Sequence, residues 1–245
     1  MSATPSISIL IPAYNEGNEL PDTLARVRAS AASVGLSDWE LIVCDNNSTD
    51  NTAAIAAGHG ARVVFEPHNQ IARARNRAAM AARGDWLLFL DADTRLSPDL
   101  LSAAVRAMGK AGVAGGGAAV ACAETPPWGA RWLTALWNGI SRRFNWAAGC
   151  FLFCRRSAWL ETGGFDERYY ASEEIWFSRR IGRWARRRGQ EFRILEGVRA
   201  VTSGRKFRWY GPLSLIGHLI LLSIPGAVRV RAFCRLWYSR PTRPD

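Results

Sequence analysis

The sequence predicts an α/β protein in which a mostly parallel, Rossmann-like sheet is flanked by helices. Over the first hundred residues, short apolar segments alternate with segments of helical spacing. Polar and acidic residues follow several of these apolar segments, at the strand ends where parallel sheets bind their ligands. The 245 residues are 48% apolar and 22% charged, which excludes global disorder, and five irregularly spaced cysteines do not make a disulfide framework.

The predicted elements of the first half follow one another closely. An apolar strand at 6–11 ends at Pro12, and a helix with apolar residues at helical spacing follows over 20–34, with Gly35 as its stop. The next elements are a strand at 40–44, a helix at 50–57 after the capping residues Ser48 and Thr49, a strand at 61–65, a helix at 71–82 and a strand at 86–90. This alternation is typical of parallel strands joined through helices.

The second half is less regular. A strand is expected at 113–122, where Gly115, Gly116 and Gly117 permit a bend or a close approach of backbone. The other expected elements are an aromatic helix or loop at 128–144, a strand at 147–154, a helix starting near Ser157, a basic helix at 173–188 and short strands at 191–195 and 198–202. We expect one globular part over 1–208 and a separate C-terminal segment over 209–245.

Charge divides the chain unevenly. Residues 1–100 carry 8 basic and 12 acidic side chains, a net of −4, whereas residues 101–245 carry 24 and 9, a net of +15. Lys110 and Lys206 are the only lysines, so the excess is almost entirely guanidinium. This asymmetry suggests an anionic partner such as phosphates, a membrane surface or nucleic acid, although an arginine-rich composition on solvated faces would explain part of it.

The C-terminal segment contains 20 uncharged residues between Arg208 and Arg229, interrupted by two prolines and a histidine. We favour a helix lying in a membrane interface, with the flanking arginines on anionic headgroups and Trp209, Trp237 and Tyr238 as anchors. A buried core helix or a dimer contact is nearly as good an interpretation. A membrane span ranks third, because the interrupted run is barely long enough.

The sharpest local signal is the sequence DAD at 91–93, directly after the apolar WLLFL. Asp91 and Asp93 flank one residue at a strand end, so both can face a single ligand. Carboxylate oxygens suit Mg²⁺ or Mn²⁺ bridging a diphosphate. Alone the tripeptide is weak evidence, because D-x-D also arises by chance and often caps the next helix.

Three further strings strengthen the signal: ILIPAYNE, which ends at Glu16, VCDNNSTD, which contains Asp45, and GGFDERYY followed by EEIWFSRR. In this order, together with DAD, they resemble the family 2 glycosyltransferases of the GT-A fold over about residues 5–210. The resemblance implies a nucleotide-binding part over about 1–110, an acceptor part over about 111–208, and an inverting, non-processive enzyme that requires Mn²⁺ or Mg²⁺.

The resemblance also implies residue roles. The loop that ends at Glu16 would cup the base and ribose of the donor, Asp45 would bind the base, usually uracil, and Asp93, with Asp91, would hold the metal. The implied nucleotide-sugar-binding residues are Pro12, Ala13, Tyr14, Glu16, Asp45, Arg73, Asn76, Asp91, Ala92, Arg205 and Lys206. The last two belong to TSGRK, whose basic residues would face the diphosphate, against the alternative of a solvated basic turn.

Glu173 and Glu174 match the acidic pair of the family, in which one carboxylate takes the proton of the acceptor hydroxyl. Glu174 aligns with the usual Asp, and because Glu is a departure there, Glu173 is an alternative for the base. By themselves, two acids at a helix N-terminus would simply complement its dipole.

The function expected is therefore transfer of a sugar from a nucleotide diphosphate sugar, a UDP-sugar by preference, to an acceptor hydroxyl. The basic second half and the apolar segment suggest a lipid-linked acceptor in polysaccharide or glycolipid assembly, and a cytoplasmic enzyme peripheral to the inner face of the cell membrane. The N-terminus lacks the features of a signal peptide. The alternatives are a sugar-phosphate nucleotidyltransferase and a non-catalytic basic protein that binds membranes or nucleic acid; nucleic-acid recognition signatures are missing, so no nucleic-acid partner is expected.

Overall fold

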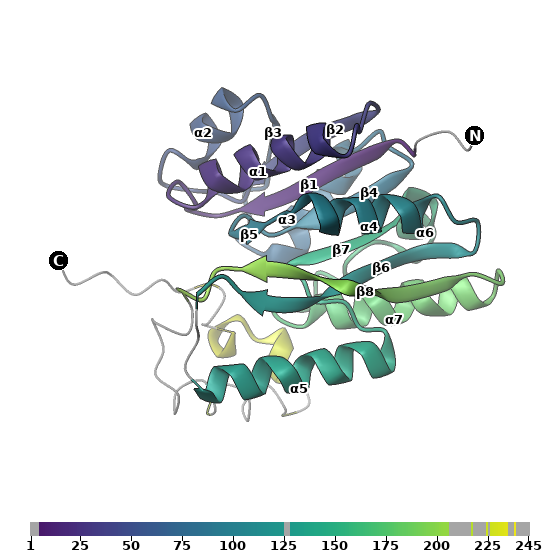
Figure 1. Cartoon of the computed structure of the whole chain (residues 1–245). Helices are drawn as coiled ribbons and strands as arrows, with labels where there is room; N and C mark the ends of the chain where they lie inside the picture. The colour runs from purple at the N-terminus through teal and green to yellow at the C-terminus, as the bar shows by residue number, and fades with distance from the viewer. Residues whose placement is uncertain are drawn as a thin grey trace.

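One eight-stranded sheet runs through the protein, with helices on both of its faces (Figure 1). The computed structural model describes residues 5–124, 128–205, 217, 224, 226–234 and 238. The strand order is β3-β2-β1-β4-β7-β6-β8-β5. Helices α1 (Leu20–Ser33) and α4 (Pro98–Met108) bury their apolar residues against one face, and α3 (Ile71–Ala81), α6 (Arg156–Thr162) and α7 (Glu173–Arg186) against the other.

The four strands of the first half are parallel, as the sequence predicts. They are β1 (Ile7–Ala13), β2 (Trp39–Asp45), β3 (Arg62–Phe65) and β4 (Trp86–Leu90), and α2 (Thr52–Gly58) connects β2 to β3. Asp45 is in register with Ala13 on one side and with Phe65 on the other. The carboxyl ends of these strands therefore share one edge of the sheet, where the next loops carry the polar residues.

The second half contributes strands of both directions. β7 (Phe151–Arg155) runs antiparallel to both β4 and β6 (Val113–Cys122), whereas β8 (Glu191–Thr202) is parallel to β6 and antiparallel to the short β5 (Thr94–Arg95). The glycines of β6 permit the close backbone approach that the sequence predicts, because a Cβ on Gly115 would lie 2.6 Å from the carbonyl oxygen of Phe153.

Several elements differ from the sequence prediction. The two short strands expected near the end of the sheet form one strand, β8, in which Gly197 adopts a φ of +75°. The pairing with β6 shifts there, from Leu195 opposite Ala118 to Arg199 opposite Ala119. β5 and α4 were not anticipated, although Ser97 is a regular N-cap that accepts a hydrogen bond from the Leu100 amide.

The aromatic segment of the second half is a helix, α5 (Trp128–Phe144), at the margin of the molecule (Figure 1). The Asn138 amide fixes it to β6, since the side chain accepts from the Val120 N–H at 2.8 Å and donates to the Val120 carbonyl at 2.9 Å. Along β6, β7 pairs only with Gly115–Gly117. Asn138 therefore hydrogen-bonds to the β6 backbone at Val120, beyond the point where the pairing with β7 ends.

The apolar stretch expected to form a C-terminal helix, 209–228, lies almost entirely outside the described residues. Of the described C-terminal part, Ala227–Arg229 and Arg231–Phe233 form two short 3₁₀ helices. Among the helices that the structure describes, none combines the length and the hydrophobicity that crossing a bilayer requires.

Candidate active site

A pocket of about 640 Å³ opens at the carboxyl ends of β1, β2 and β3. Its walls come from the loops after these strands, from the first turn of α3, from the loop before α7 and from the C-terminal segment. The lining residues are Tyr14, Asn47, Thr49, Pro67, His68, Asn69, Gln70, Arg73, Glu167, Tyr170 and Arg231. Of the predicted site residues, Tyr14 and Arg73 line this pocket.

The loops after β1 and β2 hold one another in place at the pocket. The Asn15 amide donates to the Ser48 hydroxyl at 3.0 Å, and the Thr49 amide donates to Asn15 Oδ1 at 2.7 Å. Asn15 has a φ of +51°, a conformation that asparagine tolerates well. Asp45 is buried at the end of β2, where its Oδ1 accepts from the Ser48 amide at 3.1 Å. The Asp45 carboxylate thus anchors the turn that follows it.

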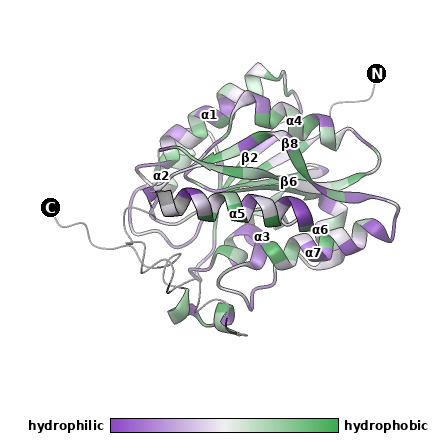
Figure 2. Ribbon diagram, turned by 60° about the horizontal axis from the view of Figure 1, so that its bottom comes forward, coloured by the Kyte–Doolittle hydropathy of each residue, from purple (hydrophilic) through white to green (hydrophobic). Residues whose placement is uncertain are grey.

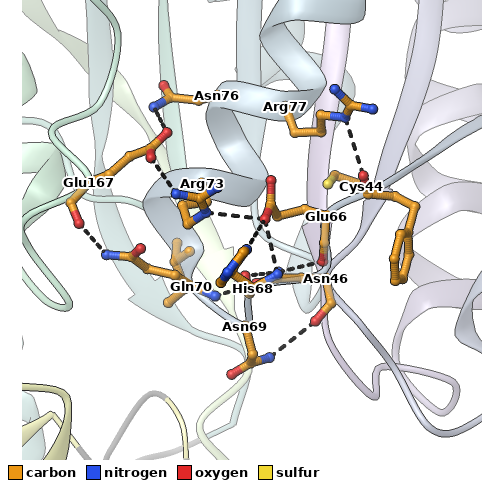
Figure 3. Close-up of polar contacts among 12 residues, drawn as sticks. Cys44, Asn46, Glu66, His68, Asn69, Gln70, Arg73, Asn76, Arg77 and Glu167 are labelled. Atoms are coloured by element: carbon orange, nitrogen blue, oxygen red, sulfur yellow. Dashed lines mark hydrogen bonds and ion pairs between the residues drawn. The ribbon is translucent and has the colours of Figure 1, made fainter.

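A polar network around Glu66 shapes the floor of the pocket (Figure 3). Glu66 Oε1 accepts from the His68 amide at 3.0 Å and from Arg73 Nε at 3.1 Å, while Arg73 Nη1 donates to Glu167 Oε2 at 2.8 Å. Burial by itself would raise the pKa of Glu66, but the hydrogen bonds from His68 and Arg73 outweigh it and lower the pKa. Glu66 therefore stays charged and orients Arg73.

Asn76, one turn further along α3, bonds to the backbone of the loop before α7. Its Nδ2 donates to the Phe165 carbonyl at 2.9 Å, and its Oδ1 accepts from the Phe165 amide at 2.8 Å. A further bond joins Asn76 to Glu167 at 3.0 Å (Figure 3). The residue therefore holds the GGFDE loop against α3, and does not line the pocket.

The centre of the site is Arg75, a residue that the sequence analysis did not single out. Its guanidinium is 3% exposed and donates from Nη1 to Glu173 Oε1 at 2.6 Å, and from Nη2 to Asp91 Oδ1 at 2.9 Å and to the Gly149 carbonyl at 3.0 Å. Burial would lower the pKa of Arg75, but the charges of Asp91 and Glu173 raise it, so the guanidinium stays charged. A signal existed, because Arg75 stands among the alanines that form the buried face of α3.

The two acids at the start of α7 have different surroundings. Glu173 is buried and committed to Arg75. Glu174 is half-buried, and among the residues that the structure describes no arginine or lysine forms an ion pair with it. Removal from water and the charge of Glu173 raise the pKa of Glu174 to about 8, against the opposing effect of Arg75. The two neighbouring acids therefore differ in their surroundings: Glu173 is paired with Arg75, whereas Glu174 has a raised pKa.

A second arginine engages the other end of the DAD sequence. Arg205 Nη2 lies 2.5 Å from Glu16 Oε1 and 3.1 Å from Asp93 Oδ2, and Thr202 Oγ1 lies 3.3 Å from Asp93 Oδ1. Burial would lower the pKa of Arg205, but Glu16 and Asp93 raise it, so it stays charged. The predicted Glu16, Asp93 and Arg205 are therefore brought together, while Lys206 lies outside the described residues.

The middle residue of DAD is fixed from behind. Ala92 is buried, and its carbonyl accepts a hydrogen bond from the Thr23 hydroxyl of α1 at 2.8 Å. The carboxylates on either side of it are paired with different arginines, Asp91 with Arg75 and Asp93 with Arg205. In the described part of the chain no cluster of three His, Cys, Asp or Glu side chains is arranged to hold a metal ion.

The pattern of Glycosyl transferase family 2 matches residues 8–169, about two thirds of the chain. The chain belongs to this family. The match contains the loops after β1 and β2, the pocket floor, Arg75 and both DAD acids. The sheet and its flanking helices are the GT-A fold that the sequence predicts, and the family is one of glycosyltransferases.

Curated relatives match over shorter stretches. An uncharacterized glycosyltransferase of Mycobacterium tuberculosis is 36% identical over 88 residues, 36% of this chain and 37% of that protein. The undecaprenyl-phosphate 4-deoxy-4-formamido-L-arabinose transferase of Shewanella sediminis is 36% identical over 104 residues, 38% of this chain and 30% of that protein. The matched regions thus span about a third of the length of these relatives.

Solved structures share the fold at low sequence identity. The Pyrobaculum calidifontis mannosyltransferase PcManGT, in complex with GDP-Man and Mn²⁺, has a TM-score of 0.65 at 18% identity, covering 96% of this chain and 70% of its own. Staphylococcus aureus TarS 1–349 in complex with UDP-GlcNAc has a TM-score of 0.64 at 16% identity, covering 82% and 59%.

Proposed function

We propose that this glycosyltransferase moves a sugar from a nucleotide diphosphate sugar, by preference a UDP-sugar, to an acceptor hydroxyl in one inverting, non-processive step. The observation that carries the proposal is the shared guanidinium of Arg75. It joins Asp91, directly after β4, to Glu173, beside the candidate base Glu174. The proposed donor-side acid and the proposed base are thereby held close to one buried side chain. Direct displacement requires such proximity, because the donor and the acceptor react in a single step.

The donor nucleotide would occupy the pocket at the ends of β1, β2 and β3. Tyr14 and Arg73 line it and would supply an aromatic face and a charged donor held by Glu66. Asp45, which is buried at the end of β2 and is not among the lining residues, would offer a carboxylate acceptor for a base N–H. A carboxylate acceptor favours a base with an N–H at its edge, as uracil has. The solved neighbours in complex with UDP-GlcNAc and GDP-Man support a nucleotide sugar as the donor.

A divalent cation fits the donor set in one way. Asp91 and Asp93 offer hard oxygen ligands, but each is paired with an arginine, and the described residues do not gather three His, Cys, Asp or Glu side chains around an ion. Mg²⁺ and Mn²⁺ are commonly held by one or two carboxylates together with substrate phosphates and water. Asp93, with Asp91, would hold such an ion with the donor, where it would neutralise charge on the departing diphosphate.

The remaining steps belong to the side chains of the chain itself. In the proposed reaction Glu174 takes the proton of the acceptor hydroxyl. At the same time the oxygen of that hydroxyl bonds to the anomeric carbon of the sugar, from the side opposite the diphosphate. The bond from that carbon to the diphosphate oxygen breaks, and the electron pair leaves with the nucleoside diphosphate. Arg205, beside Asp93, is placed to stabilise the charge that develops there.

The acceptor proposed is a hydroxyl of a sugar or of a lipid-linked molecule at the inner face of the cell membrane, within polysaccharide or glycolipid assembly. The excess of arginine in the second half supports an anionic acceptor, and the undecaprenyl-phosphate transferase among the relatives is consistent with one. Membership of the family favours glycosyl transfer over both nucleotidyl transfer and a non-catalytic basic protein.

Calorimetry of UDP binding with and without Mn²⁺ tests the proposal, comparing the wild type with Asp93→Ala. Metal-dependent binding that is lost in Asp93→Ala supports the donor site. Tight binding that ignores the metal removes Asp93 from its proposed role. Failure of UDP, GDP and dTDP alike would contradict the mechanism.

A further inference from the structure

Helix α5 presents large apolar side chains to solvent. Trp132 is 72% exposed, Leu136 62% and Phe144 54%. The helix contains no acidic residue, and its three charged residues, Arg131, Arg142 and Arg143, are all exposed. Figure 2 shows α5 running across the front of the molecule, clear of the helices that cover the sheet.

The inner face of α5 packs against the rest of the protein through Asn138 and Ser141. Asn138 and Ser141 are buried, Asn138 is bonded to Val120, and the Ser141 hydroxyl donates to the Trp146 carbonyl at 2.7 Å. These contacts fix which side of the helix faces the protein. The exposed apolar residues therefore belong to an outer face, and no turn of α5 could bury them without breaking the bonds of Asn138.

The same surface continues to the start of α7. Phe144 stacks on Trp146 with ring centroids 5.0 Å apart, and the Arg179 guanidinium lies 6.0 Å from the Trp146 ring and 4.8 Å from the Trp176 ring. Trp176 lies two residues beyond Glu174. An exposed band of aromatic side chains and arginines thus runs from α5 to the helix that carries the proposed base.

We propose that this band, here called the α5 face and formed by Trp132, Leu136, Arg142, Arg143, Phe144 and Arg179, docks on an anionic lipid bilayer. Apolar and aromatic side chains among arginines are the composition of helices that lie in the membrane interface. Arginine attracts anionic headgroups while its stem stays in apolar surroundings. A second copy of this chain fits less well, because an isologous contact would set like charges against one another.

Docking through the α5 face would place the first turn of α7 beside the headgroups. A lipid-borne hydroxyl could then reach Glu174 without the lipid leaving the bilayer. This use of the surface depends on the proposed function, whereas membrane binding itself does not. The two are separable by experiment, because vesicle binding requires neither donor nor turnover.

The experiment is co-sedimentation of the full chain with vesicles of phosphatidylglycerol and phosphatidylcholine, and with vesicles of phosphatidylcholine alone. We expect the wild type to bind the anionic vesicles preferentially and to release them at high salt. The double variant Trp132→Ser with Leu136→Ser should bind about tenfold more weakly, because two apolar side chains are lost from the interface. Arg142→Gln with Arg143→Gln should lose the preference for phosphatidylglycerol.

Met80→Ser is the matched control, since Met80 is 67% exposed on α3, outside the α5 face. It should bind vesicles as the wild type does. Calorimetry with UDP on each variant separates loss of docking from loss of the fold or of the nucleotide pocket. Unchanged vesicle binding by the serine double variant, or none by the wild type, would overturn the proposal. A dimer that this variant abolishes, without vesicle binding, would assign the face to a second copy and overturn it too.

Discussion

Asp91 and Glu173, which are 82 positions apart in the sequence, accept hydrogen bonds from the two terminal nitrogens of Arg75, at 2.9 and 2.6 Å. Asp91 directly follows β4, and Glu173 is the first residue of α7. The arginine that joins them is buried and charged, so the geometry of the site depends on a single side chain of α3.

Arg75→Met should destabilise the protein strongly, because it leaves the buried Glu173 carboxylate without its counter-ion. Breaking one side of a buried pair costs about 3–5 kcal/mol. Urea unfolding would measure the loss. Arg77→Met on the same helix is the control, since Arg77 is exposed and its replacement should stay within about 0.5 kcal/mol. Equal effects of the two variants would contradict the role given to Arg75.

Replacement of each acid in turn should separate the two glutamates of α7. Glu174→Gln removes the proposed base, and transfer should fall by about 10²- to 10⁴-fold while UDP binding is kept. Glu173→Gln should instead lower stability, because Arg75 loses one of its two paired carboxylates. Initial rates, thermal unfolding and UDP calorimetry on both variants distinguish these patterns. Full activity of Glu174→Gln would move the base elsewhere.

The pH dependence should reveal Glu174 directly. The rate of transfer should rise with pH through about 8, the pKa of Glu174 in the folded protein, because only its ionised form accepts a proton. Stability should move the opposite way. Since the pKa is raised above its ordinary value of 4.5, the folded state binds more protons in this interval, so stability falls between about pH 4.5 and 8. Glu174→Gln should remove that slope, which denaturation at several pH values would measure.

Arg205 and a divalent cation would compete for Asp93. Arg205→Gln should therefore bind Mn²⁺ severalfold more tightly without nucleotide, as read by electron paramagnetic resonance. The same variant should bind UDP with Mn²⁺ more weakly, because a cation facing the diphosphate is lost. Asp93→Asn is the counterpart and should lose Mn²⁺ binding. Identical Mn²⁺ affinities in wild type and Arg205→Gln would show that the Arg205 guanidinium does not compete with the cation for Asp93.

Asp45→Asn should weaken UDP binding by about 10- to 100-fold, the cost of losing one hydrogen bond to a charged group. The Asn side-chain oxygen can still accept from the Ser48 amide, so the turn should persist. Asp38→Asn, an exposed position just before the same strand, is the control and should bind UDP normally. Calorimetry would compare the affinity of both variants and of the wild type for UDP.

The parallel half of the sheet was predictable because each of its strands is apolar, short and bounded by clear stops. β1 to β4 agree with the expected strands to within two residues at either end. That the DAD acids and Glu16 lie near one another was predictable for the same reason, since parallel topology brings strand ends together. The role of Arg75 was not predictable: its place among alanines indicates burial, but nothing local shows that it will meet two acids from distant segments.

The second half was harder to predict because its strands take their neighbours from far along the chain. Nothing local tells that β7 will lie between β4 and β6, or that β8 will continue through a bulge at Gly197. Asn76 illustrates the same limit. The family resemblance implies that it binds the nucleotide sugar, which stays a prediction, and nothing local shows that its amide will bond to the backbone of Phe165.

The bond between Asn138 and Val120 also bears on how the protein avoids aggregation. Beyond Gly117, β6 has lost β7, and a strand edge with free amides and carbonyls is a template for pairing with a foreign chain. The Asn138 side chain imitates one residue of a neighbouring strand and closes that edge at Val120. Substitution of Asn138 would thus leave the backbone of β6 unpaired at Val120. We expect such variants to self-associate under conditions in which the fold is still intact.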